Sequence, residues 1–183
     1  QLKNSFGRYV SPAVLNEILA GRIKAGLGGA RKNVCVLFSD IRGFTRRSEG
    51  QSPEAVIGFL NRYFTEMVAA IHAHGGTLDK FIGDGIMAFF GAPEPRKNAA
   101  QDAFDCAGEM LTRLEALNRT LAAEGIEPIH IGIGLHSGEV LVGHIGSETR
   151  HEYSAIGDPV NVASRLESLT KEVGYPIVCS HAV

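Results

Sequence analysis

The sequence lacks a long apolar run and never carries five like charges in a row. A membrane-spanning helix needs about 18 or more apolar residues, and a basic block is the usual mark of a nucleic-acid-binding surface. The 18 Lys and Arg residues nearly balance the 20 Asp and Glu residues, which leaves a net charge of −2. We therefore expect no membrane contact by this segment and no nucleic-acid partner.

Cysteine is scarce as well. The three residues present, Cys35, Cys106 and Cys179, lie far apart and form no C-x-x-C pair. An odd number at such spacing fits neither a disulfide framework nor a zinc site. A reducing, cytoplasmic location is the expectation.

The 183 residues are enough for one hydrophobic core and too few for two. The first part of the chain predicts a short amphipathic helix over 11–20, followed by a glycine-rich, basic linker over 21–32. We therefore divide the chain into an N-terminal helix and linker (1–32), which would lead to an upstream regulatory region, and one folded domain (33–183).

Within that domain, apolar patterns of strand and helix type alternate. In order, they predict a buried strand (34–40), a helix from Pro53 to Gly75 capped by Ser52, a hairpin (77–91), a helix (98–123), a strand pair (129–146), a helix (159–172) and a last strand (175–180). The apolar stripe of the first long helix is expected to be Ile57, Leu60, Phe64, Val68 and Ile71. This order predicts an α+β fold, a ferredoxin-like sandwich with helices packed on one face of a mainly antiparallel sheet.

Two acids stand out in this arrangement. Asp40 follows the buried strand and Asp84 lies at the tip of the hairpin, so neighbouring strands would bring both carboxylates to one edge of the sheet. Carboxylates suit Mg²⁺ or Mn²⁺, and two such ions about 3.5–4 Å apart can hold the attacking and leaving oxygens of a phosphoryl transfer. Either acid alone is more simply explained as a cap or turn residue. The pair favours a metal site.

Two further segments carry residue types that suit phosphate chemistry. Gly43, in IRGFT (41–45), would let main-chain N–H groups face a phosphate, although any strand-to-helix turn looks similar. Asn161 and Arg165 lie four apart on one face of a predicted helix. Arg165 could stabilise charge on a phosphoryl group and Asn161 could orient a sugar. On spacing alone, a solvated polar face is the simpler interpretation.

Four segments resemble the signature blocks of the class III nucleotidyl cyclases, in that family's order. They are VLFSDIRGFT, LDKFIGDGIMAFFG, GLHSGEVLVGHIG and EYSAIGDPVNVASRLE. The resemblance implies that the acids matching Asp40 and Asp84 hold two divalent metal ions, Mg²⁺ or Mn²⁺, with the main-chain carbonyl of Ile41 as a further ligand. One ion would help to ionise the ribose 3′-hydroxyl, and the other would neutralise the triphosphate.

The resemblance also assigns the residues around the phosphates and the sugar. Asn161 and Arg165 match the family's transition-state pair, and Phe44 and Thr45 after Gly43 match the loop that covers the phosphates. Cyclase domains of this family usually continue with further strands that include a basic phosphate contact. We therefore expect that contact to lie after Val183.

Base choice depends on two positions. Lys80 stands where adenylyl cyclases of the family carry Lys and guanylyl cyclases tend to carry Glu. A Lys only donates, so it suits the acceptor N1 of adenine and not the N1–H of guanine. Ser154 stands where many members have Asp and one subgroup, often stimulated by bicarbonate, has Thr. Its hydroxyl can accept from the adenine amino group or donate to the guanine carbonyl.

The resemblance therefore implies an adenylyl cyclase that uses ATP. In this family the acids of one subunit face the base-binding residues of the other, so a chain that holds both sets is expected to form a homodimer with two shared sites. A guanylyl cyclase and a catalytically silent nucleotide-binding domain are the alternatives. A diguanylate cyclase is disfavoured because the chain has no GG(D/E)EF-type hairpin. A further expectation is an upstream sensor or membrane domain in a larger protein.

Overall fold

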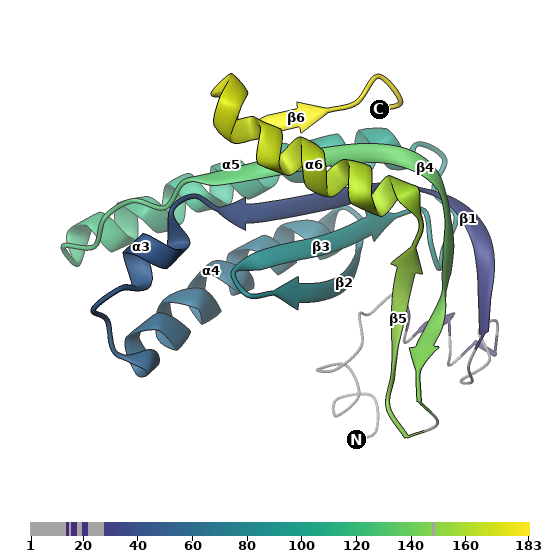
Figure 1. Cartoon of the computed structure of the whole chain (residues 1–183), viewed down its shortest axis with the longest axis horizontal. Helices are drawn as coiled ribbons and strands as arrows, with labels where there is room; N and C mark the ends of the chain where they lie inside the picture. The colour runs from purple at the N-terminus through teal and green to yellow at the C-terminus, as the bar shows by residue number, and fades with distance from the viewer. Residues whose placement is uncertain (1–13, 15, 18–19, 22–27, 148) are drawn as a thin grey trace.

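Six strands form one sheet in a computed structural model that describes residues 14, 16–17, 20–21, 28–147 and 149–183 (Figure 1). The elements are β1 (Gly28–Ile41), α3 (Phe44–Ser48), α4 (Pro53–Ala73), β2 (Thr77–Ile82), β3 (Gly85–Phe90), α5 (Ala99–Ala123), β4 (Ile131–Gly146), β5 (His151–Ile156), α6 (Asp158–Val173) and β6 (Ile177–Cys179). The strand order is β2-β3-β1-β4-β5, all antiparallel, and β6 pairs in parallel with β4. The predicted α+β class with a mainly antiparallel sheet is confirmed, and the run from β1 to β4 follows the strand–helix–strand–strand–helix–strand order of ferredoxin-like folds.

Helices cover both faces of this sheet, so the prediction that they share one face was wrong. Cys35 and Leu37 of β1 belong to the hydrophobic core beneath α4 and α5. Val34 and Val36 belong to a second core on the other face, which includes Ala163 of α6. Figure 1 shows α6 in front of the sheet and α5 behind it. Because β1 is central and buried on both sides, its sequence is nearly continuous in apolar character.

Local signals placed several elements correctly. The Ser52 side chain accepts a hydrogen bond from the Ala55 N–H at 3.2 Å, which caps α4 as predicted. The helix predicted over 98–123 is α5, and the predicted hairpin is β2–β3. The stripe expected on α4 was partly wrong, since Ile57 is 58% exposed. The buried face of α4 consists of Tyr63, Met67, Ala70 and Ile71.

The strand pair predicted over 129–146 is a single strand, β4, and β1 begins at Gly28 within the predicted linker. The two strands pair along their whole length, from Gly28 opposite His144 to Ile41 opposite Ile131. Gly138, which resembled a turn residue, serves close packing instead. A Cβ atom there would lie 2.5 Å from Cγ of Pro159 in α6. Gly132, Gly134 and Gly138 of β4 therefore mark where α6 approaches the strand.

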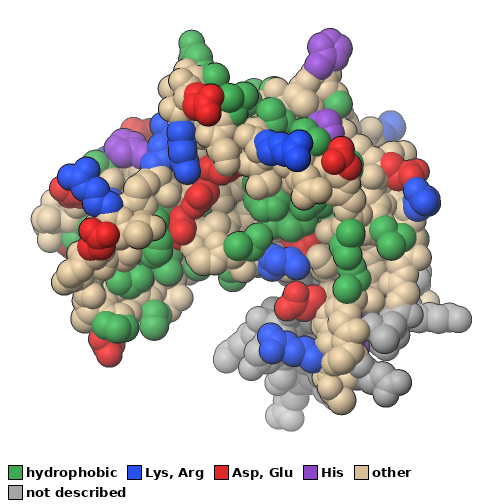
Figure 2. All heavy atoms as spheres, in the orientation of Figure 1, with side chains coloured by type: hydrophobic (Ala, Val, Ile, Leu, Met, Phe, Trp, Pro, Cys, Tyr) green, Lys and Arg blue, Asp and Glu red, His purple; other side chains and the backbone are tan. Residues whose placement is uncertain are grey.

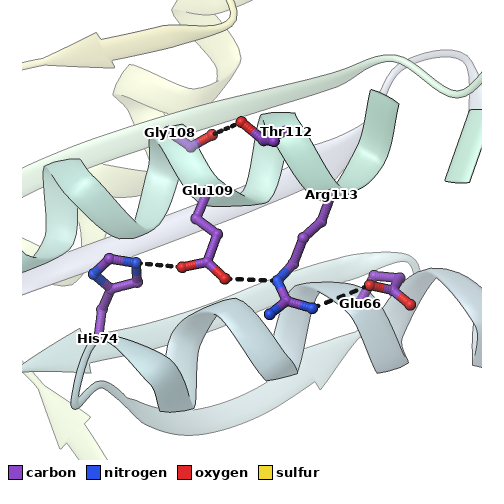
Figure 3. A network of polar contacts seen from close by, with 6 residues as sticks. All are labelled: Glu66, His74, Gly108, Glu109, Thr112 and Arg113. Carbon is purple, nitrogen blue, oxygen red and sulfur yellow. Dashed lines mark hydrogen bonds and ion pairs between the residues drawn. The ribbon is translucent and has the colours of Figure 1, made fainter. Parts of the chain in front are cut away.

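A polar network joins α4 to α5 on the outside of their shared core (Figure 3). Glu109 pairs with His74 Nε2 at 2.5 Å and accepts from Arg113 Nε at 2.7 Å. Arg113 also reaches Glu66 of α4 at 3.3 Å. These side chains are all partly exposed, so the network orients the two helices more than it stabilises them.

The helix predicted over 11–20 lies largely outside the described residues. Across the part of the chain that the structure describes, no helix combines the length and apolar character needed to cross a bilayer.

Candidate active site

Asp40 and Asp84 meet where β1 ends and the β2–β3 hairpin turns. Pairing of β1 with β3 places Ser39 opposite Ile86, so the hairpin tip lies beside the end of β1. Oδ2 of Asp84 accepts a hydrogen bond from the main-chain N–H of Ile41 at 3.0 Å. Gly85 suits the tight turn of the hairpin, because a Cβ atom there would meet the carbonyl oxygen of Ile82 at 3.0 Å. The structure thus brings the two predicted metal-binding carboxylates together.

The electrostatics of this pair favour a bound cation. Burial, followed by the hydrogen bond and charge of the neighbouring Asp84 carboxyl, raises the pKa of Asp40 to about 7. Glu167 adds a third negative charge nearby, which Lys171 partly offsets. A cation between the carboxylates would relieve this repulsion.

The donor set suits Mg²⁺ or Mn²⁺ in particular. It consists of two carboxylates and the carbonyl of Ile41, all hard oxygen ligands. The described residues contain no group of three or more His, Cys, Asp or Glu side chains that could hold a metal ion. Ions bound here would therefore take their remaining ligands from substrate phosphates and water, as Mg²⁺ usually does in nucleotide sites.

The loop after Asp40 turns at Gly43, which has φ 66° and ψ 25°, a left-handed conformation that favours glycine. It leads directly into α3, whose first N–H groups have no acceptor within the helix. Thr45 is exposed there, whereas the Phe44 ring packs against the main core. Phe44 can therefore offer a phosphate its main-chain N–H, while its side chain fixes the loop.

Arg42 ties the same loop to α6. Its guanidinium donates to the carbonyl oxygens of Thr170 and Tyr175 at 3.2 and 3.1 Å. Glu167 on α6 is 6% exposed, and burial raises its pKa while the charges of Lys171 and Arg42 oppose that shift. Arg42 thus couples the position of the loop to the helix that carries Asn161 and Arg165.

Lys80 and Ser154 line one cavity of about 250 Å³. Figure 2 shows this face of the molecule hollowed between the α4 side and the β4–β5 arm, with hydrophobic side chains gathered beneath α6. Apolar residues dominate the rest of the lining: Phe38, Ile82, Met87, Ile145, Ala155, Ile156 and Val160. Nζ of Lys80 lies 3.7 Å from Asp79 and 3.9 Å from Glu152. An apolar cavity with a few polar groups suits a flat base.

Asp79 is a site residue that sequence reasoning missed. Strand alternation places it on the opposite face from Lys80. The pairing of β2 with β3 instead skips a residue between Leu78 and Lys80, which is a β-bulge at Asp79. The bulge turns the Asp79 carboxylate towards β5, where it accepts hydrogen bonds from the Ser154 hydroxyl and the Ala155 N–H. No local sequence signal marks this bulge.

Asn161 and Arg165 lie on the exposed side of α6, four residues apart as predicted. The opposite side of the helix is buried through Ala163, Glu167 and Thr170. Neither Asn161 nor Arg165 forms a hydrogen bond with another described side chain. Neither Asp40 nor Asp84 is among the residues that line the cavity containing Lys80 and Ser154.

Comparison with known proteins places these features in a family. The model of the adenylate and guanylate cyclase catalytic domain matches residues 29–178. Adenylate cyclase 1 of Rhizobium meliloti (strain 1021) is 37% identical over 179 residues, which are 98% of this chain and 27% of that protein. The chain thus spans little more than a quarter of the length of this curated relative.

Two solved structures are similar as well. The guanylyl cyclase Cya2 is 46% identical, with a TM-score of 0.75 over 78% of this chain and 72% of that one. The adenylyl cyclase CyaB from P. aeruginosa is 40% identical, with a TM-score of 0.76 over 85% of this chain and 80% of that one. With the family model covering most of its length, the chain belongs to the adenylate and guanylate cyclase catalytic domains.

Proposed function

We propose that this domain is an adenylyl cyclase, which converts ATP into 3′,5′-cyclic AMP and pyrophosphate. The ribose O3′ loses its proton and forms a bond to the α-phosphorus, while the bond from that phosphorus to the β-phosphate oxygen breaks. The observation that carries the proposal is the combination, in one chain, of a paired-carboxylate site and a base-sized cavity that contains Lys80.

Asp40, Asp84 and the carbonyl of Ile41 would hold two divalent ions, Mg²⁺ or Mn²⁺. When bound, these ions supply positive charge that favours ionisation of the 3′-hydroxyl and neutralises the triphosphate. The raised pKa of Asp40 supports this assignment, because it reflects burial of the carboxyl beside a second carboxyl, Asp84, and a cation would offset both costs.

The other assigned residues would bind and orient the nucleotide. Main-chain N–H groups from Gly43 to Thr45 would donate to phosphate oxygens. On α6, Asn161 would hold the ribose so that O3′ is in line with the α-phosphorus, and Arg165 would stabilise the charge that develops there. The exposure of both side chains supports these roles, since a substrate can reach them.

The base is adenine in this proposal because Lys80 can only donate. Adenine N1 accepts a hydrogen bond, whereas guanine N1 carries a hydrogen. The similarity to the guanylyl cyclase Cya2 makes guanylyl cyclase activity the second candidate. Turnover of ATP and GTP by the purified chain with Mg²⁺ or Mn²⁺ tests the choice. A higher kcat/KM for GTP would contradict it.

We further propose a homodimer with two shared sites. Neither Asp40 nor Asp84 lines the cavity that contains Lys80 and Ser154, and in this proposal a second copy completes each site. Exposed apolar side chains around the cavity support an interface on this face: Ile82 is 54% exposed and Ile156 is 53% exposed. Large apolar residues left exposed together commonly mark contact surfaces.

Mixing two inactive variants tests this assembly. Asp40→Ala removes one half of a site and Arg165→Ala removes the other, so each homodimer is inactive. A mixed dimer would contain one intact site, and activity should return to roughly half of wild type per mixed dimer. Mixing Asp40→Ala with Asp84→Ala is the matched control, because both changes damage the same half. No recovery in mixed dimers would refute shared sites.

A catalytically silent nucleotide-binding domain is disfavoured because all four residues that such a domain would be expected to lose are present: Asp40, Asp84, Asn161 and Arg165. The free thiols of Cys35, Cys106 and Cys179 support a cytoplasmic location. We propose that the part of residues 1–32 that precedes β1 connects the domain to an upstream regulatory region. The partial coverage of the Rhizobium meliloti protein supports it.

A further inference from the structure

The Ser154 hydroxyl is held from behind the cavity by a buried carboxylate. Its Oγ lies 2.9 Å from both Oδ1 and Oδ2 of Asp79. The Ala155 N–H donates to Oδ2 of the same carboxylate at 2.9 Å. The Asp79 side chain is 0% exposed, and Asp79 does not line the cavity. Asp79 therefore acts on any ligand only through the neighbours that it holds.

These contacts limit what Ser154 can do. A serine hydroxyl has one proton to donate, and an ionised carboxylate only accepts. Since the proton is directed to Asp79, the lone pairs of Oγ are what remains for a molecule in the cavity. Burial raises the pKa of Asp79, while the Ala155 N–H, the Ser154 hydroxyl and the charge of Lys80 oppose that shift by favouring the ionised form.

We infer that Asp79 is a specificity-determining positioning residue: it fixes Ser154 as a hydrogen-bond acceptor and so makes the cavity select adenine over guanine. The inference rests on the proposed cyclase function and deepens it. Without Asp79, the hydroxyl could serve either base. With it, Ser154 is an acceptor in a cavity whose cationic donor, Lys80, lies 3.9 Å from the Glu152 carboxylate.

That pair is complementary to the edge of adenine. Adenine offers an acceptor at N1 and a donor in its 6-amino group, which match Lys80 and Ser154 respectively. Guanine offers a donor at N1 and an acceptor at O6, so both positions are mismatched. A binding site rejects a ligand more strongly when the ligand leaves a polar group of the site unpaired than when the ligand merely lacks an apolar contact.

The decisive variant is Asp79→Asn, which keeps the size of the side chain. The Asn carbonyl can still accept from the Ala155 N–H, but its amide group donates to Oγ of Ser154. The Ser154 proton is then free to point into the cavity. We expect kcat/KM for ATP to fall by about tenfold and kcat/KM for GTP to rise, so that the ATP/GTP ratio drops by roughly 100-fold.

A purely structural role gives a different result. If Asp79 only ties β2 to β5, Asp79→Asn will lower both rates in parallel and leave the ratio unchanged, which overturns the inference. The second arm repeats the change in a Ser154→Ala background. There Asp79→Asn is expected to leave the ATP/GTP ratio unaltered, because the group through which Asp79 acts is gone. A further large change in ratio in that background also overturns it.

Affinity measurements separate this inference from the proposed function. Calorimetric binding of 3′-deoxy-ATP and 3′-deoxy-GTP with Mg²⁺ reads base selectivity without any cyclisation. A wild-type chain that prefers the adenine analogue and loses the preference in Asp79→Asn supports the role of Asp79 even if no cyclic product forms. Cyclisation of ATP with an unchanged preference in Asp79→Asn overturns the role of Asp79 alone. A wild-type chain that binds neither analogue overturns both.

Should Asp79→Asn fail to fold, wild type and Ser154→Ala suffice. Purine riboside triphosphate keeps the acceptor N1 and lacks the 6-amino group. Wild type is expected to prefer ATP over it by about tenfold, and Ser154→Ala to lose that preference. Equal rates with the two nucleotides in wild type overturn the inference.

Discussion

Gly134→Ala tests how α6 is held against the sheet. Gly134 lies in β4 opposite Phe38 of β1, directly beneath α6. A Cβ atom there would lie 2.3 Å from the carbonyl oxygen of Ala163 and 2.3 Å from the main-chain nitrogen of Glu167. Ordinary contact begins at 3.4 Å, so the added methyl group is too close by about 1 Å. Both neighbours are backbone atoms, which cannot rotate away.

The helix must therefore move by about 1 Å or the sheet must yield. Overpacking of this kind costs about 1–3 kcal/mol, which for a chain of this size lowers Tm by about 5 °C. The turn of α6 that moves carries Arg165, and a displacement of about 1 Å in a positioned group can cost roughly 100-fold in rate. We expect kcat/KM for ATP to fall by that order while the fold survives.

Gly108→Ala is the matched control. Gly108 lies on the exposed side of α5, where an added Cβ atom meets nothing within 4 Å. Because alanine is the better helix former, stability should rise by up to about 1 kcal/mol with turnover unchanged. Thermal melts and cyclic AMP assays on both variants provide the readout. Wild-type Tm and wild-type kcat/KM in Gly134→Ala would show that the packing argument is wrong.

Three further outcomes are expected. In metal-free buffer, Asp40 holds its proton more tightly in the folded state, with a pKa of about 7 against 3.8 for the ordinary group, so stability should fall as the pH rises between these values. Because Asp40 is only half-buried, we expect the free energy of unfolding to fall by about 1–2 kcal/mol. Urea unfolding of wild type and Asp40→Asn, both with a chelator, at pH 5 and pH 8 measures this loss. An equal change in the free energy of unfolding with pH in both proteins would contradict it. Ser52→Ala removes the cap that accepts from Ala55 and should cost about 1 kcal/mol in urea unfolding without changing KM. Glu109→Gln should cost less than about 1 kcal/mol, since the network around it is partly exposed; a Tm loss above about 5 °C would show that the network is a major source of stability.

Local chemistry let the sequence determine much of the fold. The cap at Ser52, the turn around Asp84 and the length of α5 each depend on residues within a few positions of one another. The same holds for the placement of Asn161 and Arg165 on one side of α6, which follows from helical spacing. Asp40 and Asp84 were expected to meet because a hairpin beside a strand leaves few other arrangements.

Long-range packing decided the rest. The sequence of β4 resembled two strands because its glycines look like turn signals, yet Gly132, Gly134 and Gly138 lie where α6 packs on the strand. Which face α6 occupies could not be predicted from its own pattern, since both faces of β1 are apolar.

Asp79 shows most clearly which contacts could not be predicted from the sequence alone. Its sequence context predicts an ordinary strand residue on the opposite side from Lys80. The bulge in β2 and the approach of β5 bring its carboxylate to Ser154, 75 positions away in the chain. The sequence by itself determined the family, and it singled out Asp40, Asp84 and Lys80 as candidates for the metal and base contacts. Only the tertiary structure decided which way the Ser154 hydroxyl points, because that direction depends on a contact between the two edge strands of the main strand order.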